Sequence, residues 1–271
     1  MNPMDAKESA NGIIVSVANR DKTDSYVPPA MVSLVVLAYL IIMLRYYALT
    51  LESFDGALTL SQMFNMMSIF VIGMALVLLV FYLLMSRNIK HMRRESTLRC
   101  LLANYAESVG ADVRELRRID SDIRAQEKEG SYKIRKIALV LPAALGTGAL
   151  FFLDLQTYGA GMMILCWALS LVAIFAVAPA LTTAPRAHEK RTLPFYEEFN
   201  RISPGIGMDT AGFERVIGAR SFLLFIAVTA LTAGFFLPVW AFMTFNDMNR
   251  HFMEQWYFED SVIRSLRRAF P

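Results

Sequence analysis

The chain has little cysteine and little histidine, with two cysteines and three histidines in 271 residues. Cys100 lies in a charged stretch and Cys166 in the middle of an apolar run, so we expect no disulfide between them. The sequence contains no Cys-x-x-Cys, His-Glu-x-x-His or His-x-x-x-His spacing, no Gly-rich phosphate loop and no Gly-x-Ser-x-Gly elbow. These absences remove the common short motifs of metal sites, nucleotide sites and serine hydrolases.

An excess of charge of one sign is also missing. The formal net charge of +3 is too small to suggest nucleic-acid binding. The long apolar runs contain one charged residue, Arg45, which lies near the end of its run. Ion-coupled transporters and proton pumps need ionisable groups near the middle of the bilayer. The sequence therefore argues against an ion-coupled transporter, although a lipid pathway stays open.

Apolar residues are abundant and gather in long runs. They make up 55% of the chain, and the mean hydropathy is +0.41. The runs approach or exceed the length needed to cross about 30 Å of hydrocarbon at about 1.5 Å per residue. They cover residues 28–47, 64–85, 137–153, 160–181 and 221–245. The sequence therefore predicts an all-α, polytopic membrane protein with about five transmembrane helices.

A shift of 97 residues aligns the chain with itself. It places His91 on His188, and Gly110 likewise falls on Gly207. Apolar positions fall on apolar positions without a gap, and a third, shorter copy begins near His251. We therefore expect an internal repeat. The predicted parts are a flexible polar tail (1–26), repeat 1 (27–136), repeat 2 (137–220) and a partial repeat 3 (221–271).

Each of the first two histidines is followed by a charged stretch with one apolar face. Apolar residues recur at helical spacing from Leu98 to Val109, and Gly110 is placed to end that helix. A second short helix is expected in each stretch, the later one passing through Phe213 and Val216. Each full repeat is thus predicted to have two membrane helices and a pair of amphipathic cytoplasmic helices, and the partial repeat to end in one amphipathic helix.

Basic residues are confined to one kind of connection between the apolar runs. The links inside the paired runs are acidic, whereas the stretches after His91 and His188 are rich in Lys and Arg. Because Lys and Arg flank the cytoplasmic ends of membrane helices, we expect a multi-pass protein of the cell membrane with a cytoplasmic N-terminus. The last run leaves two alternatives. It forms one plain span, or a short hairpin that turns near 232–234 and leads back to the cytoplasmic side.

The last apolar run and the residues after it carry a family resemblance. Thr232, Gly234 and Trp240 lie in an aromatic-rich turn, and the segments 249–251 and 258–260 follow. This pattern resembles the uncharacterised family called domain of unknown function 4234, although the tyrosine that usually precedes the tryptophan is absent. Members of that family are small prokaryotic membrane proteins, often with tandem copies. The resemblance implies an architecture and brings no known activity.

The three histidines are candidates for chemistry. In a pseudo-symmetric bundle His91, His188 and His251 could converge, and three imidazoles could bind zinc while two could ligate haem. The alternative is that each lies at the membrane–water interface and bonds a headgroup or a helix end. We prefer that alternative because no ligand spacing supports a metal, and we expect no cofactor. The acidic pair 259–260 is interpreted similarly, as the solvated face of a helix.

Clustered Lys and Arg beside apolar faces suit contact with anionic lipid or with a protein partner. The candidates for such contacts are Arg93, Arg94, Arg117, Arg118, Lys190, Arg191, Arg267 and Arg268. We therefore favour a structural or partner- and lipid-binding membrane component over an enzyme. Its expected partners are membrane lipids, other proteins or a second copy of the chain, and no nucleic acid.

Two other functions stay open. One is a transporter of small solutes or lipids built from the repeats, which a polar cavity at mid-membrane would favour. The other is a membrane enzyme or a metal or haem binder that uses the three histidines. Histidine rings close to one another would favour this function. A filled bundle with dispersed histidines would favour the structural role.

Overall fold

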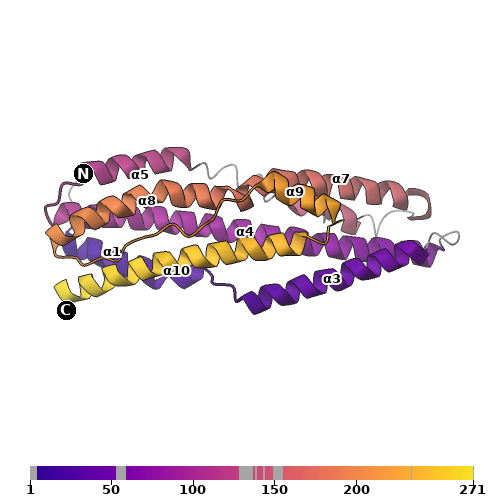
Figure 1. Ribbon diagram of the computed structural model, residues 1–271, viewed down its shortest axis with the longest axis horizontal. Coiled ribbons are helices and arrows are strands. Elements are labelled where there is room, and N and C mark those ends of the chain that lie inside the picture. Colours follow the sequence, from indigo (N-terminus) through magenta and orange to yellow (C-terminus); the bar gives the residue numbers. More distant parts are fainter. Residues whose placement is uncertain are drawn as a thin grey trace.

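The structure is a computed structural model that describes residues 5–52, 59–127, 137, 139–142, 144–148, 155–232 and 234–270. Every regular element in these ranges is a helix, and the helices form an elongated bundle (Figure 1). The elements are α1 (Ala6–Ala18), α2 (Arg20–Thr23), α3 (Pro29–Glu52), α4 (Leu60–Ser108), α5 (Arg114–Gln126), α7 (Leu155–Thr182), α8 (Ala184–Ile202), the 3₁₀ helix η2 (Ser203–Ile206), α9 (Phe222–Leu231) and α10 (Leu237–Ala269). The predicted all-α class is confirmed for the described residues.

Three helical stretches are long and apolar enough to cross a membrane: Pro29–Leu51, Leu60–Ser108 and Ile164–Ile206. Large apolar side chains point away from the bundle along them, and more than half of the surface of Leu34 and of Leu79 is exposed. Lipid tails solvate such side chains, whereas water does not. These features support the prediction of a membrane protein. The third apolar run, at 137–153, lies partly outside the described residues.

Helix α4 runs through most of the length of the bundle (Figure 1). It starts at a capping box made by Thr59 and Gln62 and has 49 residues, which is roughly 70 Å at about 1.5 Å per residue. Its apolar part ends near Met85, and the charged stretch with His91 continues in the same helix. The sequence predicts a membrane run followed by a separate charged helix. The structure joins the two without a break.

The bundle has an apolar half and a charged half, each with its own core. The core of the apolar half brings α3, α4, α7 and α10 together around Phe81 and Trp240. The core of the charged half brings α1, α4, α5, α8 and α10 together around Leu102, Phe199 and Phe258. Because α4 and α10 contribute to both cores, the two halves form one continuous bundle.

The predicted flexible tail over residues 1–26 is wrong for Ala6–Ala18, which form α1. Ala10, Ile13 and Val17 lie on one face of this helix and are at most 7% exposed. They pack into the core of the charged half, against α4. The spacing of these three residues is that of an amphipathic helix, and the surrounding polar residues conceal it in the composition.

The two predicted helix ends behave alike, but the segments after them differ. Gly110 and Gly207 both adopt left-handed backbone angles, with φ of 88° and 73°, which favour glycine. Helix α5 follows Gly110, as predicted. The second helix predicted through Phe213 and Val216 is wrong, because residues 208–221 contain no helix. Their backbone N–H groups bond to side chains of α8 and α10 instead.

The last apolar run forms a helical hairpin rather than one plain span. Helix α9 has ten residues, which is about 15 Å and too short to cross a bilayer. The chain turns at Gly234, where φ is 93°, and α10 returns toward the charged half. The hydroxyl of Tyr39 donates a hydrogen bond to the Gly234 carbonyl oxygen at 3.3 Å. Of the two predicted alternatives, the hairpin is therefore the one observed.

Candidate metal centre

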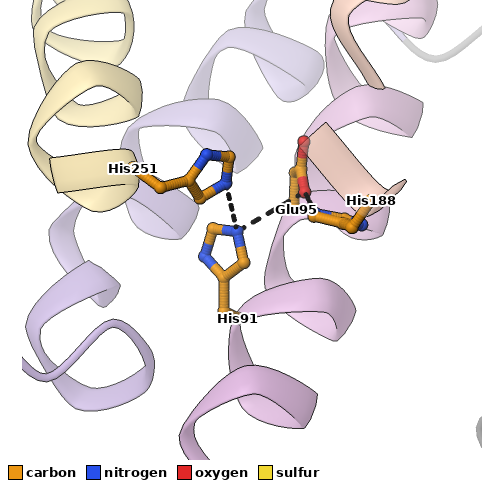
Figure 2. Close-up of side chains that lie close together, drawn as sticks. All are labelled: His91, Glu95, His188 and His251. Carbon is orange, nitrogen blue, oxygen red and sulfur yellow. Dashed lines mark hydrogen bonds and ion pairs between the residues drawn. The ribbon is translucent and has the colours of Figure 1, made fainter. Parts of the chain in front are cut away.

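The three histidines meet inside the charged half (Figure 2). His91 comes from α4, His188 from α8 and His251 from α10. Their ring centroids lie 5.0, 5.6 and 5.9 Å apart, and each residue is at most 3% exposed. The prediction that each histidine lies separately at the membrane–water interface is therefore wrong. Helices from three distant parts of the chain bring the rings to one point.

Glu95 joins the histidines and completes a group of four possible metal ligands. It lies one turn after His91 on α4, so both side chains project from the same face. The Nε2 atoms of His91 and His251 are 3.2 Å apart, and Glu95 Oε2 is 3.6 Å from His91 Nε2. His188 Nε2 contacts the same Glu95 oxygen. One ligand atom from each residue lies within 4.8 Å of all the others.

These separations fit a small tetrahedral cation. Zinc–nitrogen bonds of about 2.0–2.1 Å place neighbouring ligand atoms of a tetrahedron roughly 3.3–3.4 Å apart. The separations of 3.2 Å between the His91 and His251 nitrogens and 3.6 Å between His91 and Glu95 lie on either side of this value. The contact of His188 Nε2 with Glu95 Oε2 is shorter, so these two atoms would have to move apart to bind one ion. Three imidazoles and one carboxylate are also a ligand set that suits zinc.

A carboxylate stands behind each imidazole. The Nδ1 atom of His91 lies 3.1 Å from Asp24 Oδ1. The Nδ1 atom of His188 lies 2.6 Å from Glu127 Oε1. A third contact of this kind joins His251 Nδ1 to an oxygen of Glu189 at 3.1 Å. Such carboxylates fix the orientation of metal-binding histidines and raise the basicity of the nitrogen that faces the metal.

The arrangement leaves unshared electron pairs directed at the centre. A histidine whose Nδ1–H faces a carboxylate keeps Nε2 unprotonated. His91 and His251 both have this environment, and their Nε2 atoms face each other at 3.2 Å. Two unshared pairs at this distance would repel each other, so either one imidazole donates an N–H to the other or a cation lies between them. The outer carboxylates thus prepare the inner nitrogens for a metal ion.

Two imidazoles of the group differ in their affinity for a proton. Both lie past the apolar parts of their segments, beyond Met85 and beyond Thr182. Burial lowers the pKa of His91 to about 4, against the opposing effect of Asp24. Burial would also lower the pKa of His188, but Glu95 and Glu127 outweigh it and raise that pKa to about 9. Near pH 7, His91 is therefore neutral, while His188 holds a proton that a metal ion would displace.

Arg94 connects two carboxylates behind the centre. It contacts Asp24 and lies 2.7 Å from Glu259 Oε1, and Gln255 donates a hydrogen bond to the same glutamate oxygen. Burial raises the pKa of Glu259 to about 7, although Arg94 acts in the opposite direction. Burial would raise the pKa of Asp24 too, but His91 and Arg94 hold it below its usual range. Glu259 is 1% exposed, so the interpretation of 259–260 as a solvated face is wrong for this residue.

Glu95 is held on its other oxygen. The Tyr196 hydroxyl donates a hydrogen bond to Glu95 Oε1 at 2.8 Å, which leaves Oε2 for the histidines. The guanidinium of Arg99 lies 3.5 Å from the same Oε1 and donates a hydrogen bond to Asp120 at 2.9 Å. These contacts hold the carboxylate in one orientation and support its charge in a buried site.

The predicted lipid- or partner-contact residues divide into buried and exposed members. Arg94 is 7% exposed and engaged by two carboxylates, so it is not a surface contact, and that prediction is wrong. Arg117 and Arg191 are half-buried. The exposed members are Arg93, Arg118, Lys190, Arg267 and Arg268. Within this set Arg118 forms ion pairs with Glu115 and Asp122 on its own helix.

Sequence reasoning missed Glu95 and the three outer carboxylates. The spacing of His91 and Glu95, four residues apart on a helix, was the available signal for the fourth ligand. Asp24 lies in the segment predicted to be a flexible tail, and nothing local marks Glu127 as a partner of a histidine. Only the packing of α1, α2 and α5 onto α4 brings these carboxylates to the centre.

Comparisons of the chain with protein-family models, with curated proteins and with solved structures gave no match.

Proposed function

We propose that the protein is a membrane-anchored metalloprotein that holds one Zn²⁺ ion between His91, Glu95, His188 and His251. The observation that carries this proposal is the two-layered arrangement of the site. The inner nitrogens of His91 and His251 face each other at 3.2 Å, and each of the three imidazoles has a carboxylate behind it. The expectation of a protein without cofactor gives way to this proposal, which belongs to the metal-binding alternative raised by the sequence.

Zinc fits better than haem, the other cofactor considered for the histidines. A porphyrin cannot enter between ring nitrogens that are 3.2 Å apart. Three imidazoles with a carboxylate in a compact group match tetrahedral zinc. Other divalent transition metals accept the same ligands, and the Irving–Williams order gives zinc a higher affinity than manganese or iron.

The enclosure of the site favours a structural or regulatory ion over a hydrolytic one. Catalytic zinc sites keep one position open for water, whereas structural sites fill four positions with protein ligands. Here four protein ligands are available, and each is at most 3% exposed. The ion would join α4, α8 and α10, with α5 and the backbone at 216–217 attached through Glu127 and Glu189. This role agrees with the structural or partner- and lipid-binding component favoured by the sequence.

The membrane arrangement that accompanies this proposal is the one expected from the charge pattern. The charged half, which contains the metal centre, lies on the cytoplasmic side of the cell membrane together with the N-terminus. The apolar runs form four crossings and a re-entrant α9–α10 hairpin, buried against α3 through Tyr39. The matching left-handed glycines at 110 and 207 support an internal repeat with amphipathic cytoplasmic helices. Membership in the family 4234 stays a proposal for the C-terminal segment.

Metal content tests the proposed function directly. The full-length chain, purified in mild detergent and passed through a metal-scavenging resin, should contain one zinc ion per chain by inductively coupled plasma mass spectrometry. The zinc X-ray absorption spectrum should show nitrogen and oxygen neighbours at about 2.0–2.1 Å and no sulfur.

The substitution His188→Asn should abolish binding, whereas Thr97→Ala, on the exposed face of α4, should leave it unchanged. Purified protein without metal that also fails to bind added zinc, cobalt or iron would refute the proposal. So would a His188→Asn variant with the zinc content of the unmodified chain.

A further inference from the structure

A cavity lies beside the metal centre, between α3, α4 and α10. Its volume is about 390 Å³. Most of its walls are apolar, with Val32, Val36, Val80, Phe81, Leu237 and Ala241 among the lining residues. Leu83 and Val35 line it as well and are exposed on the outside of the bundle, where the apolar half meets lipid. The walls therefore suit a hydrocarbon chain that enters from the bilayer.

The cavity is elongated, and the end toward the charged half is polar. The lining residues on α4 run from Leu76 to Lys90, which spans roughly 21 Å at about 1.5 Å per residue. Side chains with hydroxyl or cationic groups line the polar end: Thr23, Ser25, Ser86, Arg87 and Lys90. A long apolar slot with a cationic end has the shape and polarity of a site for an anionic amphiphile.

Arg87 is the central feature of the polar end. It is only 6% exposed. Its Nη2 donates a hydrogen bond to Asn249, and its guanidinium lies over the rings of Phe252 at 4.4 Å and Phe245 at 5.9 Å. Within the described residues, its Nε and Nη1 atoms have no hydrogen-bond partner. The buried hydroxyl of Ser86 also has none there.

A buried guanidinium with two unpartnered nitrogen atoms is costly unless an anion accepts their N–H groups. Arginine presents its N–H groups as a planar fork that matches the two oxygens of a carboxylate or phosphate. The adjacent Ser86 hydroxyl and the Lys90 ammonium can add further donors to the same anion.

We infer that the cavity binds one anionic lipid, with its acyl chain along the apolar walls and its carboxylate or phosphate at Arg87 and Ser86. A lipid fits better than a free anion because the greater part of the lining is apolar and open toward the bilayer side of the bundle. The site shares no side chain with the four metal ligands. It can therefore be tested without changing a proposed metal ligand, although Phe252 contacts both Arg87 and His91.

Lipid retention tests this inference on the full-length chain. The protein is reconstituted in nanodiscs of phosphatidylcholine with one-fifth phosphatidylglycerol, extracted in mild detergent and analysed by native mass spectrometry. The unmodified chain should retain one phosphatidylglycerol. Arg87→Gln should lower that retention about tenfold, the effect of losing a charge-assisted hydrogen bond. Arg250→Gln, which removes an exposed cation of α10, should leave it unchanged.

A second pair of variants tests the acyl-chain part and does not depend on the folding of Arg87→Gln. Val36→Phe adds bulk to a lining residue and should reduce retention, whereas Leu37→Phe, on the exposed side of α3, should not. Retention of phosphatidylcholine and phosphatidylglycerol in the 4:1 proportion of the nanodiscs would overturn the inference. Retention unaffected by both Arg87→Gln and Val36→Phe would also overturn it. So would thermal stabilisation by inorganic phosphate with no retained lipid, because the ligand would then be a free anion.

Discussion

The two halves of this bundle differ in the kinds of side chain that they bury and expose. In the apolar half the side chains inside and outside are alike, and Leu34 and Leu79 remain more than half exposed. In the charged half a network of ionisable groups is buried beside the apolar core, and His91, Glu95, Arg99 and His251 are all fully buried. The apolar half can rely on lipid as its solvent, but the charged half has to satisfy its buried groups within the protein.

The contrast shows where specificity resides. Packing of apolar helices in lipid has little hydrophobic driving force, so small residues and shape determine their contacts. A buried network of ionisable groups is stable only when each group meets its partner. The charged half should therefore depend on single residues far more than the apolar half does, and the following experiments test this difference from the largest expected effect to the smallest.

Loss of a metal ligand should have the largest effect. His251→Ala should abolish stoichiometric zinc binding and expose amides of α8 and α10 to hydrogen exchange, while the amides of α3 keep their protection. Met253→Ala, at an exposed site on the same helix, is the control and should retain zinc. Equal loss of protection in both halves would mean that the two halves unfold together, and it would contradict the difference between them.

The second-largest effect is expected from a substitution that weakens the packing of α1 onto the charged half. Ile13→Ala removes a fully buried side chain and should destabilise the charged half by about 2–4 kcal/mol. Val15→Ala, on the same helix but 59% exposed, should change stability little. Thermal denaturation in detergent and limited proteolysis between residues 18 and 29 would measure both. A similar small effect of the two substitutions would show that α1 contributes little to the core.

Substitution of an outer carboxylate should lower zinc affinity less than loss of a ligand does, but more than substitution of an acidic residue on the surface. Glu189→Gln keeps the shape of the side chain and weakens its hold on His251, so zinc affinity should fall roughly 10–100-fold. Competition with a zinc-selective chelator would measure the change. Glu197→Gln, at an exposed position on α8, should have no effect. An unchanged affinity in Glu189→Gln would count against the two-layered site.

The affinity for zinc should change with pH, in a direction set by the protonation of His188. Its pKa of about 9 in the folded, metal-free protein exceeds the value of about 6.5 expected after unfolding. The bound proton therefore stabilises the metal-free fold fully below pH about 6.5, and this contribution is lost as the pH rises through 9.

Zinc replaces that proton, so its apparent affinity should rise about tenfold per pH unit between pH 6.5 and 8.5. Calorimetry in buffers of different ionisation enthalpy should show about one proton released per ion at pH 7. Proton uptake, or an affinity independent of pH, would contradict this expectation.

The smallest effect is expected at a backbone position. Gly207→Ala places a side chain at a φ of 73° and should cost about 1 kcal/mol, although nothing crowds the added carbon. Gly205→Ala lies two residues away in open space, without a positive φ, and should be neutral. Chemical denaturation of the two variants would compare them. A larger loss in Gly205→Ala would reject the conformational explanation.

The sequence predicts the parts of this molecule that depend on local pattern. The helix end at Gly110 and the apolar helices within the described residues are present, and the turn near Gly234 is one of the two alternatives that the sequence leaves open. Hydropathy and glycine conformation act over a few residues, so a local pattern is enough to reveal them. The sequence also predicts the shared register of His91 and His188. It does not predict that they touch, since that depends on how α4, α8 and α10 pack.

The sequence raises the three histidines as possible metal ligands, but this alternative is not preferred because the three histidines lie far apart in sequence. Short ligand motifs describe residues on one helix or loop, whereas 160 residues separate the His91 and His251 rings that lie in contact. The outer carboxylates are even harder to predict, because the sequence around each of them carries no recognisable pattern. Asp24 reaches the centre only because α1 buries Ile13 on α4 and brings the following turn with it.

The same separation in sequence has a consequence for the time course of synthesis. At about 5–20 residues per second, roughly 10–30 s pass between the synthesis of His91 and that of His251. During this interval Asp24 and Glu95 are already made, while His188 is missing for the first 97 residues and His251 until the end. The nascent chain must keep these carboxylates hydrated until α10 arrives. At the proposed metal centre, coordination by all four ligands therefore requires that the hairpin has turned, which would make metal uptake a late step in the maturation of the bundle.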